Sequence, residues 1–172
     1  IQHPMKSKLI ALIMLCSVSV IYAQEFVNGT LITTRYDTIA NVDIQVMNDA
    51  KSLLHLTYID AEGNTHKPDI DDIKCYTRGE EVFCRIYSAG DMILVKQIVR
   101  GKKLNLFKRT YNGNDIHYIE KVYDECIKVP ASSGKFRKVM SSFLAASSDI
   151  AAKIKSKELQ DIYEIVKLYN EG

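Results

Sequence analysis

Thiols and imidazoles are the side chains of this chain most suited to covalent and proton-transfer chemistry. Cys75 and Cys84 lie on either side of Gly79-Glu80, in a run rich in aromatic and β-branched residues. If Gly79-Glu80 is the loop of a tight hairpin, the two cysteines face each other at a non-hydrogen-bonded pair, with Cα atoms about 4.5 to 5.5 Å apart. We therefore expect a Cys75–Cys84 disulfide, which leaves Cys126 as a single free thiol; the alternative is that Cys75 and Cys84 are reduced, unreactive neighbours on one face of the sheet.

His55, His66 and His117, together with Cys126, are the residues able to supply the base and the nucleophile of a hydrolase. The chain has no Gly-x-Ser-x-Gly motif, and no two of these histidines have the close spacing of a helical zinc pair. We therefore predict no catalytic residue, no metal ligand and no cofactor. A hydrolase site would have to be assembled by the fold.

Asp69, Asp71 and Asp72 form an acidic cluster whose oxygen atoms are of the kind that Ca²⁺ binds. The nearby Gly63 is out of register with a calcium loop, in which an aspartate comes first and a glycine sixth. We expect a solvated turn here instead.

Four tyrosines recur in strand-like segments: Tyr58, Tyr76, Tyr87 and Tyr118. A tyrosine combines an apolar ring with a polar hydroxyl, so a row of them along strands suits the binding of a sugar or a peptide. Ordinary packing between neighbouring strands produces the same pattern. We take these four tyrosines as candidate ligand-binding residues, with packing as the alternative.

Alternation of apolar and polar residues between turn signals predicts a series of antiparallel strands. Asn112-Gly113 readily adopts the positive φ angles of a tight hairpin, and Arg35-Tyr36-Asp37 and Asp60 to Asn64 mark further turns. The predicted strands cover residues 29–34, 38–46, 53–59, 71–78, 81–87, 92–99, 104–109 and 116–121.

Past Val129-Pro130 the apolar period changes to that of helices. Short helices are predicted over 135–146, after a capping Ser148, and over 159–169. The fold class is thus α+β: an antiparallel β-meander forming a curved sheet or partly open barrel, followed by a C-terminal group of short α-helices. We divide the chain into upstream residues and signal peptide 1–23, the β-meander 24–128, and a helical segment 129–172 packed on the same domain.

Residues 1–23 are typical of a bacterial export signal. Met5 is followed by Lys6 and Lys8 and then by the apolar run 9–21, and cleavage is expected before Gln24. The apolar run is short for a membrane span, so we predict no transmembrane span in the mature chain. The expected location is the periplasm or the outer cell surface, where disulfides form.

Charge balance bears on the class of partner. Removing Lys6 and Lys8 from the 23 Lys and Arg leaves 21 basic side chains, which equals the 21 acidic ones. Nucleic acids and anionic membranes require concentrated positive charge, and the mature sequence has no block of Lys or Arg. We therefore predict that nucleic acid is not a partner.

Several short motifs in a fixed order carry a family resemblance. They are Gly29-Thr30-Leu31-Ile32-Thr33, Asp37-Thr38-Ile39, Val129-Pro130, Phe136-Arg137-Lys138 and the closing Ile165-Val166-Lys167-Leu168-Tyr169-Asn170. With the export signal before them, they resemble a group of uncharacterised secreted proteins of Bacteroidetes. The resemblance implies an envelope protein without an assigned activity, and it supplies no catalytic residues.

These observations together predict an exported, non-enzymatic envelope or periplasmic module that binds or interacts with another molecule. The partner would be an unknown envelope protein or a surface glycan. The alternative is a small secreted hydrolase whose site is assembled only in the fold.

The hairpin register makes a prediction about oxidation. Non-reducing mass spectrometry of exported protein should find a peptide joining Cys75 to Cys84 and one alkylatable thiol, Cys126. Because the closed loop is short, replacing both bonded cysteines by serine should lower the free energy of unfolding by no more than about 2 to 3 kcal/mol. Three alkylatable thiols, or a bridge that includes Cys126, would contradict it.

Overall fold

The structure, a computed structural model, describes residues 24–122 and 124–172. The predicted export signal, residues 1–23, lies outside the described residues. In chain order the elements are β1 (Phe26–Thr33), β2 (Thr38–Gln45), α2 (Asp49–Ser52), β3 (Tyr58–Ile59), β4 (Thr65–His66), the 3₁₀ turn η1 (Ile70–Asp72), β5 (Ile73–Arg78), β6 (Glu81–Ser88), β7 (Asp91–Val99), β8 (Leu104–Tyr111), β9 (Asn114–Lys121), β10 (Cys126–Lys128), α3 (Ser133–Phe143), α4 (Ser148–Ser156) and α5 (Ile162–Glu171).

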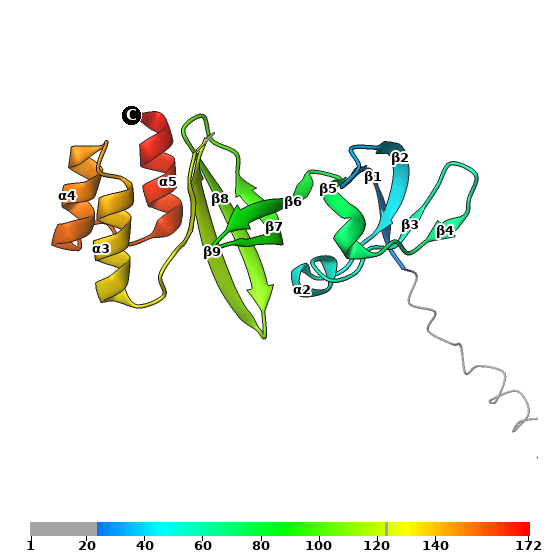
Figure 1. The fold of residues 1–172 in the computed structure, drawn as a ribbon, viewed down its shortest axis with the longest axis horizontal. Coiled ribbons are helices and arrows are strands. Elements are labelled where there is room, and N and C mark those ends of the chain that lie inside the picture. The colour runs from blue at the N-terminus through cyan, green and yellow to red at the C-terminus, as the bar shows by residue number, and fades with distance from the viewer. Residues whose placement is uncertain (1–23, 123) are drawn as a thin grey trace, which may run out of the picture.

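Within the described residues the strands form one ten-stranded sheet in the order β10-β9-β8-β7-β6-β5-β1-β2-β3-β4 (Figure 1). The strand pairs are antiparallel, so the predicted α+β meander is confirmed at this level. The meander has one break, because β5 returns to pair with β1 instead of β4. At this junction a side chain on Gly29 would collide with the carbonyl group of Thr77, which explains the glycine.

The turn chemistry predicted two hairpins correctly. Gly79-Glu80 separates β5 from β6, and Cys75 lies directly opposite Cys84 as expected. On the other face of the same hairpin the Tyr76 and Phe83 rings stack, with centroids 4.5 Å apart. The β8–β9 hairpin turns at Asn112-Gly113, where both residues have positive φ.

The predicted strand 53–59 is wrong over most of its length. Helix α2 ends at Ser52, directly before this segment; a turn at residues 53–54, irregular backbone at 55–57 and the two-residue strand β3 occupy residues 53–59. The preceding helix α2 starts at Asp49 because the side chain of Asn48 accepts a hydrogen bond from the backbone N–H of Lys51, at 2.9 Å. Leu53 and Leu56 are buried from this irregular segment, so their apolar character reflects the core and not a strand period.

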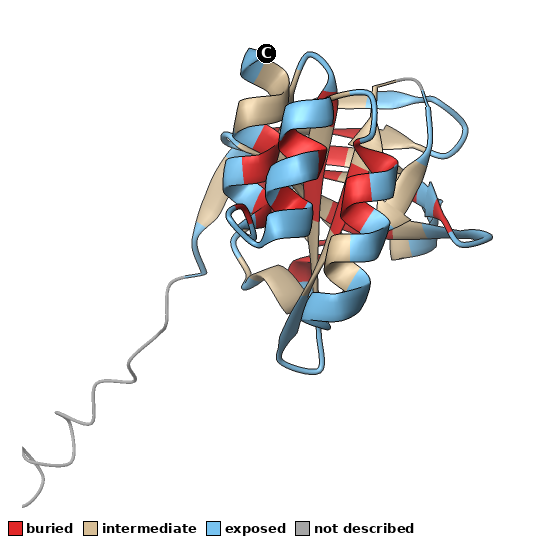
Figure 2. Cartoon of the chain, turned by 90° about the vertical axis from the view of Figure 1, so that its left-hand side faces the viewer, coloured by how far each residue is buried: buried red, intermediate tan, exposed pale blue. Residues whose placement is uncertain are grey.

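Helices α3, α4 and α5 cover one face of β8 and β9, and their buried residues face the sheet (Figure 2). The predicted boundaries shift slightly: α4 begins at Ser148, with Ser147 at the cap position, and Asp161 caps α5 through the backbone N–H groups of Tyr163 and Glu164. Near the end of α5, Asn170 exchanges hydrogen bonds with the backbone of Leu104. These contacts bind the last helix to the first residue of β8.

The opposite face of the sheet buries a second set of side chains, and no helix of the described residues contributes to it. Ile86, Val95, Phe107 and Tyr118 form this cluster, with the partly buried Cys84 and Cys126 against it. Strand β10 lies close to β6 across the cluster, although the two strands are not hydrogen-bonded neighbours. Among the helices of residues 24–122 and 124–172, none is long and apolar enough to cross a membrane.

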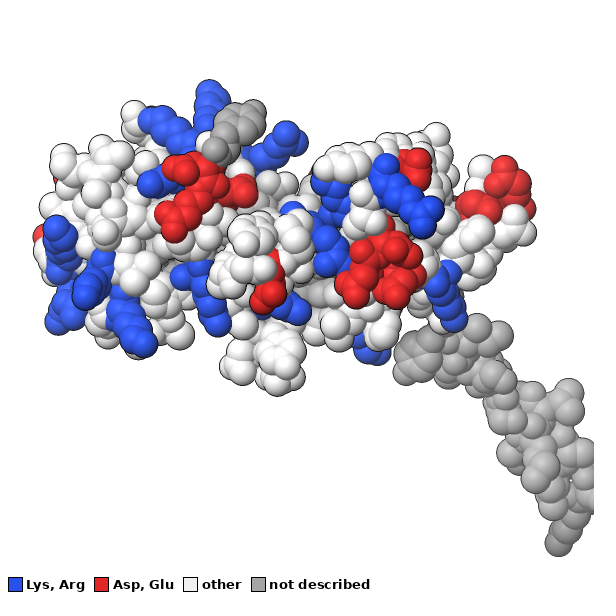
Figure 3. Space-filling model, in the orientation of Figure 1, with Lys and Arg blue, Asp and Glu red and all other residues white. Residues whose placement is uncertain are grey.

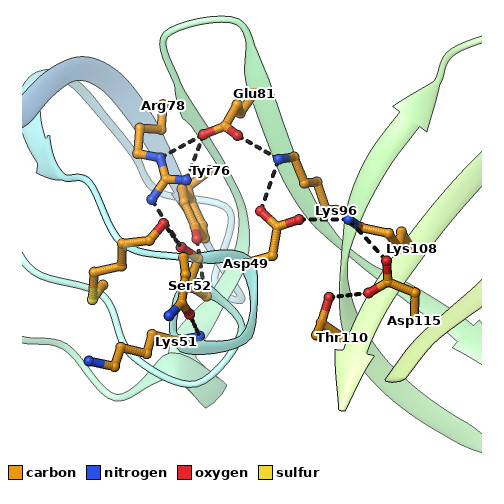
Figure 4. A network of polar contacts seen from close by, with 12 residues as sticks. Asp49, Lys51, Ser52, Tyr76, Arg78, Glu81, Lys96, Lys108, Thr110 and Asp115 are labelled. Atoms are coloured by element: carbon orange, nitrogen blue, oxygen red, sulfur yellow. Dashed lines mark hydrogen bonds and ion pairs between the residues drawn. The ribbon is translucent and has the colours of Figure 1, made fainter. Parts of the chain in front are cut away.

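Helix α2 is held on the sheet by a partly buried network of charges (Figure 4). Asp49 accepts hydrogen bonds from Lys96 and pairs with Lys108, each at 2.9 Å. Arg78, with only 4% of its side chain exposed, donates to Glu81 at 2.6 and 2.8 Å. Because Lys96 also contacts Glu81, one continuous chain of ion pairs joins the helix to strands β5 to β8.

The network predicts a loss of stability in acid. Burial alone raises the pKa of Asp49, but hydrogen bonds from Lys108 and Lys96 outweigh it and hold that pKa below 3.8. This stabilisation is therefore present above the ordinary carboxyl pKa and is lost as the pH falls through it toward the lowered value. Replacing Asp49→Asn should cost about 1 to 3 kcal/mol near neutral pH, and the difference from wild type should shrink in acid.

Urea unfolding at several pH values measures this effect. The matched control is Asp91→Asn, an exposed strand position without an ion pair in the described part of the chain, which should change stability by less than about 0.5 kcal/mol. Equal losses in the two variants, or an Asp49→Asn effect that does not vary with pH, would contradict the stabilising role.

Candidate functional site

A cavity of about 270 Å³ opens beside the β1–β2 turn. Its floor is apolar: Leu31 and Ile73 are almost fully buried, and Tyr58 is 8% exposed. Its rim is polar and charged. The rim residues are Thr33, Thr34, Arg35, Asp37 and Asp72.

Backbone hydrogen bonds fix the rim. The N–H of Thr33 donates to the carbonyl group of Asp37 at 2.9 Å, and the N–H of Asp37 donates to the Thr33 hydroxyl at 3.2 Å. The N–H of Thr34 donates to the carbonyl group of Asp72 at 2.8 Å, which ties the turn to η1. The Asp72 carboxylate and the Arg35 guanidinium have no ion pair among the described residues, so both remain available to a ligand.

Tyr58 is positioned by the short β3–β4 hairpin. Its ring stacks on that of His66 with centroids 4.8 Å apart and an interplanar angle of 17°. His66 Nε2 lies 2.6 Å from Asp60 Oδ2, and Asp60 also accepts hydrogen bonds from the N–H groups of Glu62 and Asn64. The turn thus orients the imidazole, and the imidazole supports the tyrosine at the cavity floor.

A second cavity of about 410 Å³ adjoins the first, and Pro68 lines both. His55 and the 56% exposed Leu54 line it together with Lys67 and Ile70. Residues of the segment before β5 therefore line both cavities.

The four candidate tyrosines do not form the predicted platform. Tyr76 is 1% exposed, and its hydroxyl donates to the carbonyl group of Ser52. Tyr118 is buried in the cluster on the other face, and Tyr87 is exposed but lines neither cavity. Alternation along a strand places tyrosines on both faces, so only Tyr58 reaches the cavity.

The residues of the hydrolase alternative are dispersed. His66 contacts Asp60, His117 contacts the hydroxyl of Tyr163 at 3.0 Å, and His55 lines the second cavity. In residues 24–122 and 124–172 no hydrogen bond joins a histidine to a serine, threonine or cysteine. Burial raises the pKa of the Cys126 thiol to about 12, which opposes its use as a nucleophile.

The other two thiols are similarly held in their neutral form. Burial raises the pKa of Cys75, and it raises that of Cys84 to about 12, with the neighbouring Cys75, Glu120 and Cys126 adding to the shift. All three thiols are unbonded in the structure. The Cys75–Cys84 register suits a disulfide, and the bond itself stays a prediction.

The acidic cluster makes local contacts. The Asp69 side chain accepts a hydrogen bond from the N–H of Asp71 at the start of η1, and Asp71 pairs with Arg85 at 2.8 Å. Within the described residues no group of three His, Cys, Asp or Glu side chains is arranged to hold a metal ion.

Comparison with known proteins adds no assignment: no family model, no curated protein and no solved structure matches the chain. The resemblance to secreted Bacteroidetes proteins therefore stays a prediction.

The charged rim of the cavity was missed by sequence reasoning. Arg35 and Asp37 were interpreted only as turn residues, and Asp72 as part of a solvated acidic turn. The fold joins them because β5 pairs with β1, a long-range contact that no local pattern indicates. The spacing of Thr33 and Asp37 was a usable signal, because it suits a turn that is closed by a hydrogen bond between a side chain and the backbone.

The turn below Tyr58 makes a prediction about protonation. The hydrogen bond from His66 lowers the pKa of Asp60 to about 2. Replacing His66→Phe keeps an aromatic ring beside Tyr58 but removes this donor, so the Asp60 pKa should rise toward its usual value of about 3.9. A carboxyl-carbon NMR titration measures it. A wild-type Asp60 that titrates at the usual value would contradict the arrangement.

Proposed function

We propose that the chain is an exported, non-enzymatic binding module of the envelope or periplasm, and that its ligand occupies the cavity beside the β1–β2 turn. The observation that supports this most is the cavity itself, with its apolar floor and a rim that carries one guanidinium and two carboxylates. Such a lining is typical of a site that binds through a few fixed polar groups over an apolar surface.

The size and lining favour the glycan over the protein partner. About 270 Å³ is slightly below the range of roughly 300 to 1,000 Å³ common for small-molecule sites, so it suits a single sugar ring. Tyr58 offers an aromatic surface at the floor, and the carboxylates of Asp37 and Asp72 accept hydrogen bonds from hydroxyl groups. Arg35 adds donors for ring or ester oxygens.

Binding is favoured over catalysis by the surroundings of the histidines. A general base must lie within hydrogen-bond range of the proton that it removes. The nearest approach to a catalytic pair is His66 with Asp60, and no hydroxyl or thiol in the described chain completes it. This pair is the one observation that favours the hydrolase, which we retain as the second candidate.

The proposal has two further parts. Export rests on the pattern of residues 1–23 and on the Bacteroidetes resemblance. We also propose that β6 to β10 make up a partly open barrel, which is supported by the proximity of β10 to β6 and by the apolar cluster between them.

Binding to a panel of defined bacterial oligosaccharides tests the function. Wild type should retain at least one glycan. Arg35→Ala and Asp72→Asn, which remove exposed rim groups, should each weaken that binding by about tenfold or more while the melting temperature stays unchanged. Tyr87→Ala is the matched control, because it removes an exposed tyrosine outside the cavity.

Two outcomes would contradict the proposal. Loss of glycan binding in Tyr87→Ala but not in the rim variants would place the site elsewhere. Turnover of a glycan or ester substrate that is abolished by His66→Phe would support the hydrolase instead.

A further inference from the structure

The C-terminal helices carry a cavity of a different chemical type. It measures about 550 Å³ and lies between α3 and α4. Three cationic residues line it, Arg137, Lys138 and Lys155, together with Ser141 and Ser142. No carboxylate belongs to this lining in the described chain.

Positive charge is concentrated around this cavity. Residues 133–157 contain the six cations Lys135, Arg137, Lys138, Lys153, Lys155 and Lys157. Their one acidic residue, Asp149, lies 2.8 Å from Lys153 and therefore neutralises a lysine outside the lining. In Figure 3 the Lys and Arg side chains gather over the α3 and α4 end of the molecule. From Gln24 onward the chain has equal numbers of basic and acidic side chains, so its net charge of zero does not reveal this local excess of positive charge.

The three cations of the lining have no internal counter-charge. Arg137, Lys138 and Lys155 form no ion pair among the described residues. The electrostatic field in a hollow lined by one sign of charge favours a ligand of the opposite sign. The exposed Ser142 adds a hydroxyl group, whereas the hydroxyl of the buried Ser141 donates to the carbonyl group of Lys138. Three cations and one hydroxyl group match the several oxygen atoms of a phosphate group better than the two of a carboxylate.

An apolar groove lies on the other side of helix α3. This second hollow, of about 310 Å³, is lined by Ile127 of β10 and by Val139 and Phe143 of α3. The Val139 side chain is 37% exposed. Lys138 and Ser142 line both hollows, so the cationic and apolar surfaces are contiguous.

The two hollows also define how a ligand that occupies both would be oriented. Glu125 lines the apolar groove, so an anionic group is repelled there and attracted to the cationic cavity. An extended polyanion would use the cationic cavity and leave the apolar groove empty. A molecule with a compact anionic head and a short hydrocarbon chain uses both.

We propose that α3, with α4 and β10, binds an alkyl phosphate, a single-chain amphiphile with a phosphate head. The phosphate contacts Arg137, Lys138 and Lys155, and the hydrocarbon chain crosses α3 to lie against Val139 and Phe143. This site is separate from the cavity beside the β1–β2 turn.

Calorimetric titration of the protein with decyl phosphate, kept below its micelle concentration, tests the site. Saturable binding is expected. Inorganic phosphate should bind at least about tenfold more weakly because it leaves the groove empty, and decyl maltoside should bind at least about tenfold more weakly because its head is neutral. Lys138→Gln should weaken decyl phosphate binding by about tenfold, and Val139→Ser should weaken decyl phosphate but not inorganic phosphate.

Lys153→Gln is the matched control, because it removes the same charge from an exposed lysine outside both hollows. Its binding should equal that of wild type, and unchanged melting temperatures will show that all three variants fold. Equal weakening by Lys153→Gln and Lys138→Gln would show non-specific attraction and overturn the site. Binding of decyl maltoside or inorganic phosphate as tight as that of decyl phosphate would overturn the amphiphile, and so would a lack of saturable binding.

Discussion

The ion pairs that hold helix α2 on the sheet are the interaction on which the cavity beside the β1–β2 turn depends. Arg78 is buried, so its guanidinium requires Glu81 and the hydroxyl of Ser52, and leaving such a charge unpaired costs roughly 3 to 5 kcal/mol. The docked helix directs Leu53 and Leu56 into the core, and the chain then enters β3 at Tyr58. The position of Tyr58 at the cavity floor therefore depends on ion pairs that lie outside the cavity.

The two faces of the sheet are buried in different ways, and this explains where the hollows lie. One face is covered by α2 toward one end and by α3 to α5 toward the other, while the opposite face closes over its own side chains as β10 approaches β6. Packed side chains, including Tyr76 and Tyr118, therefore cover the middle of the sheet. Ligand-sized hollows remain at the β1–β2 turn and between the C-terminal helices.

Local turn chemistry made much of the fold predictable, and long-range pairing limited the rest. Gly79-Glu80 and Asn112-Gly113 set the registers of two hairpins correctly, and the change of period after Pro130 indicated the helices. Helix α2 was missed because a capped single turn has no apolar period, and the pairing of β5 with β1 has no local signal. Of the candidate site, Tyr58 was predicted, whereas the charged rim depends on that pairing.

NMR shift mapping with a retained glycan is the decisive test of sugar binding in the cavity beside the β1–β2 turn. If the sugar binds there, amide shifts on titration should concentrate in residues 31–39, at Tyr58 and in residues 68–73, and the glycan signals should be unchanged after prolonged incubation. Shifts centred on His117 and Tyr163 or on Tyr87, or the appearance of cleaved glycan, would contradict it.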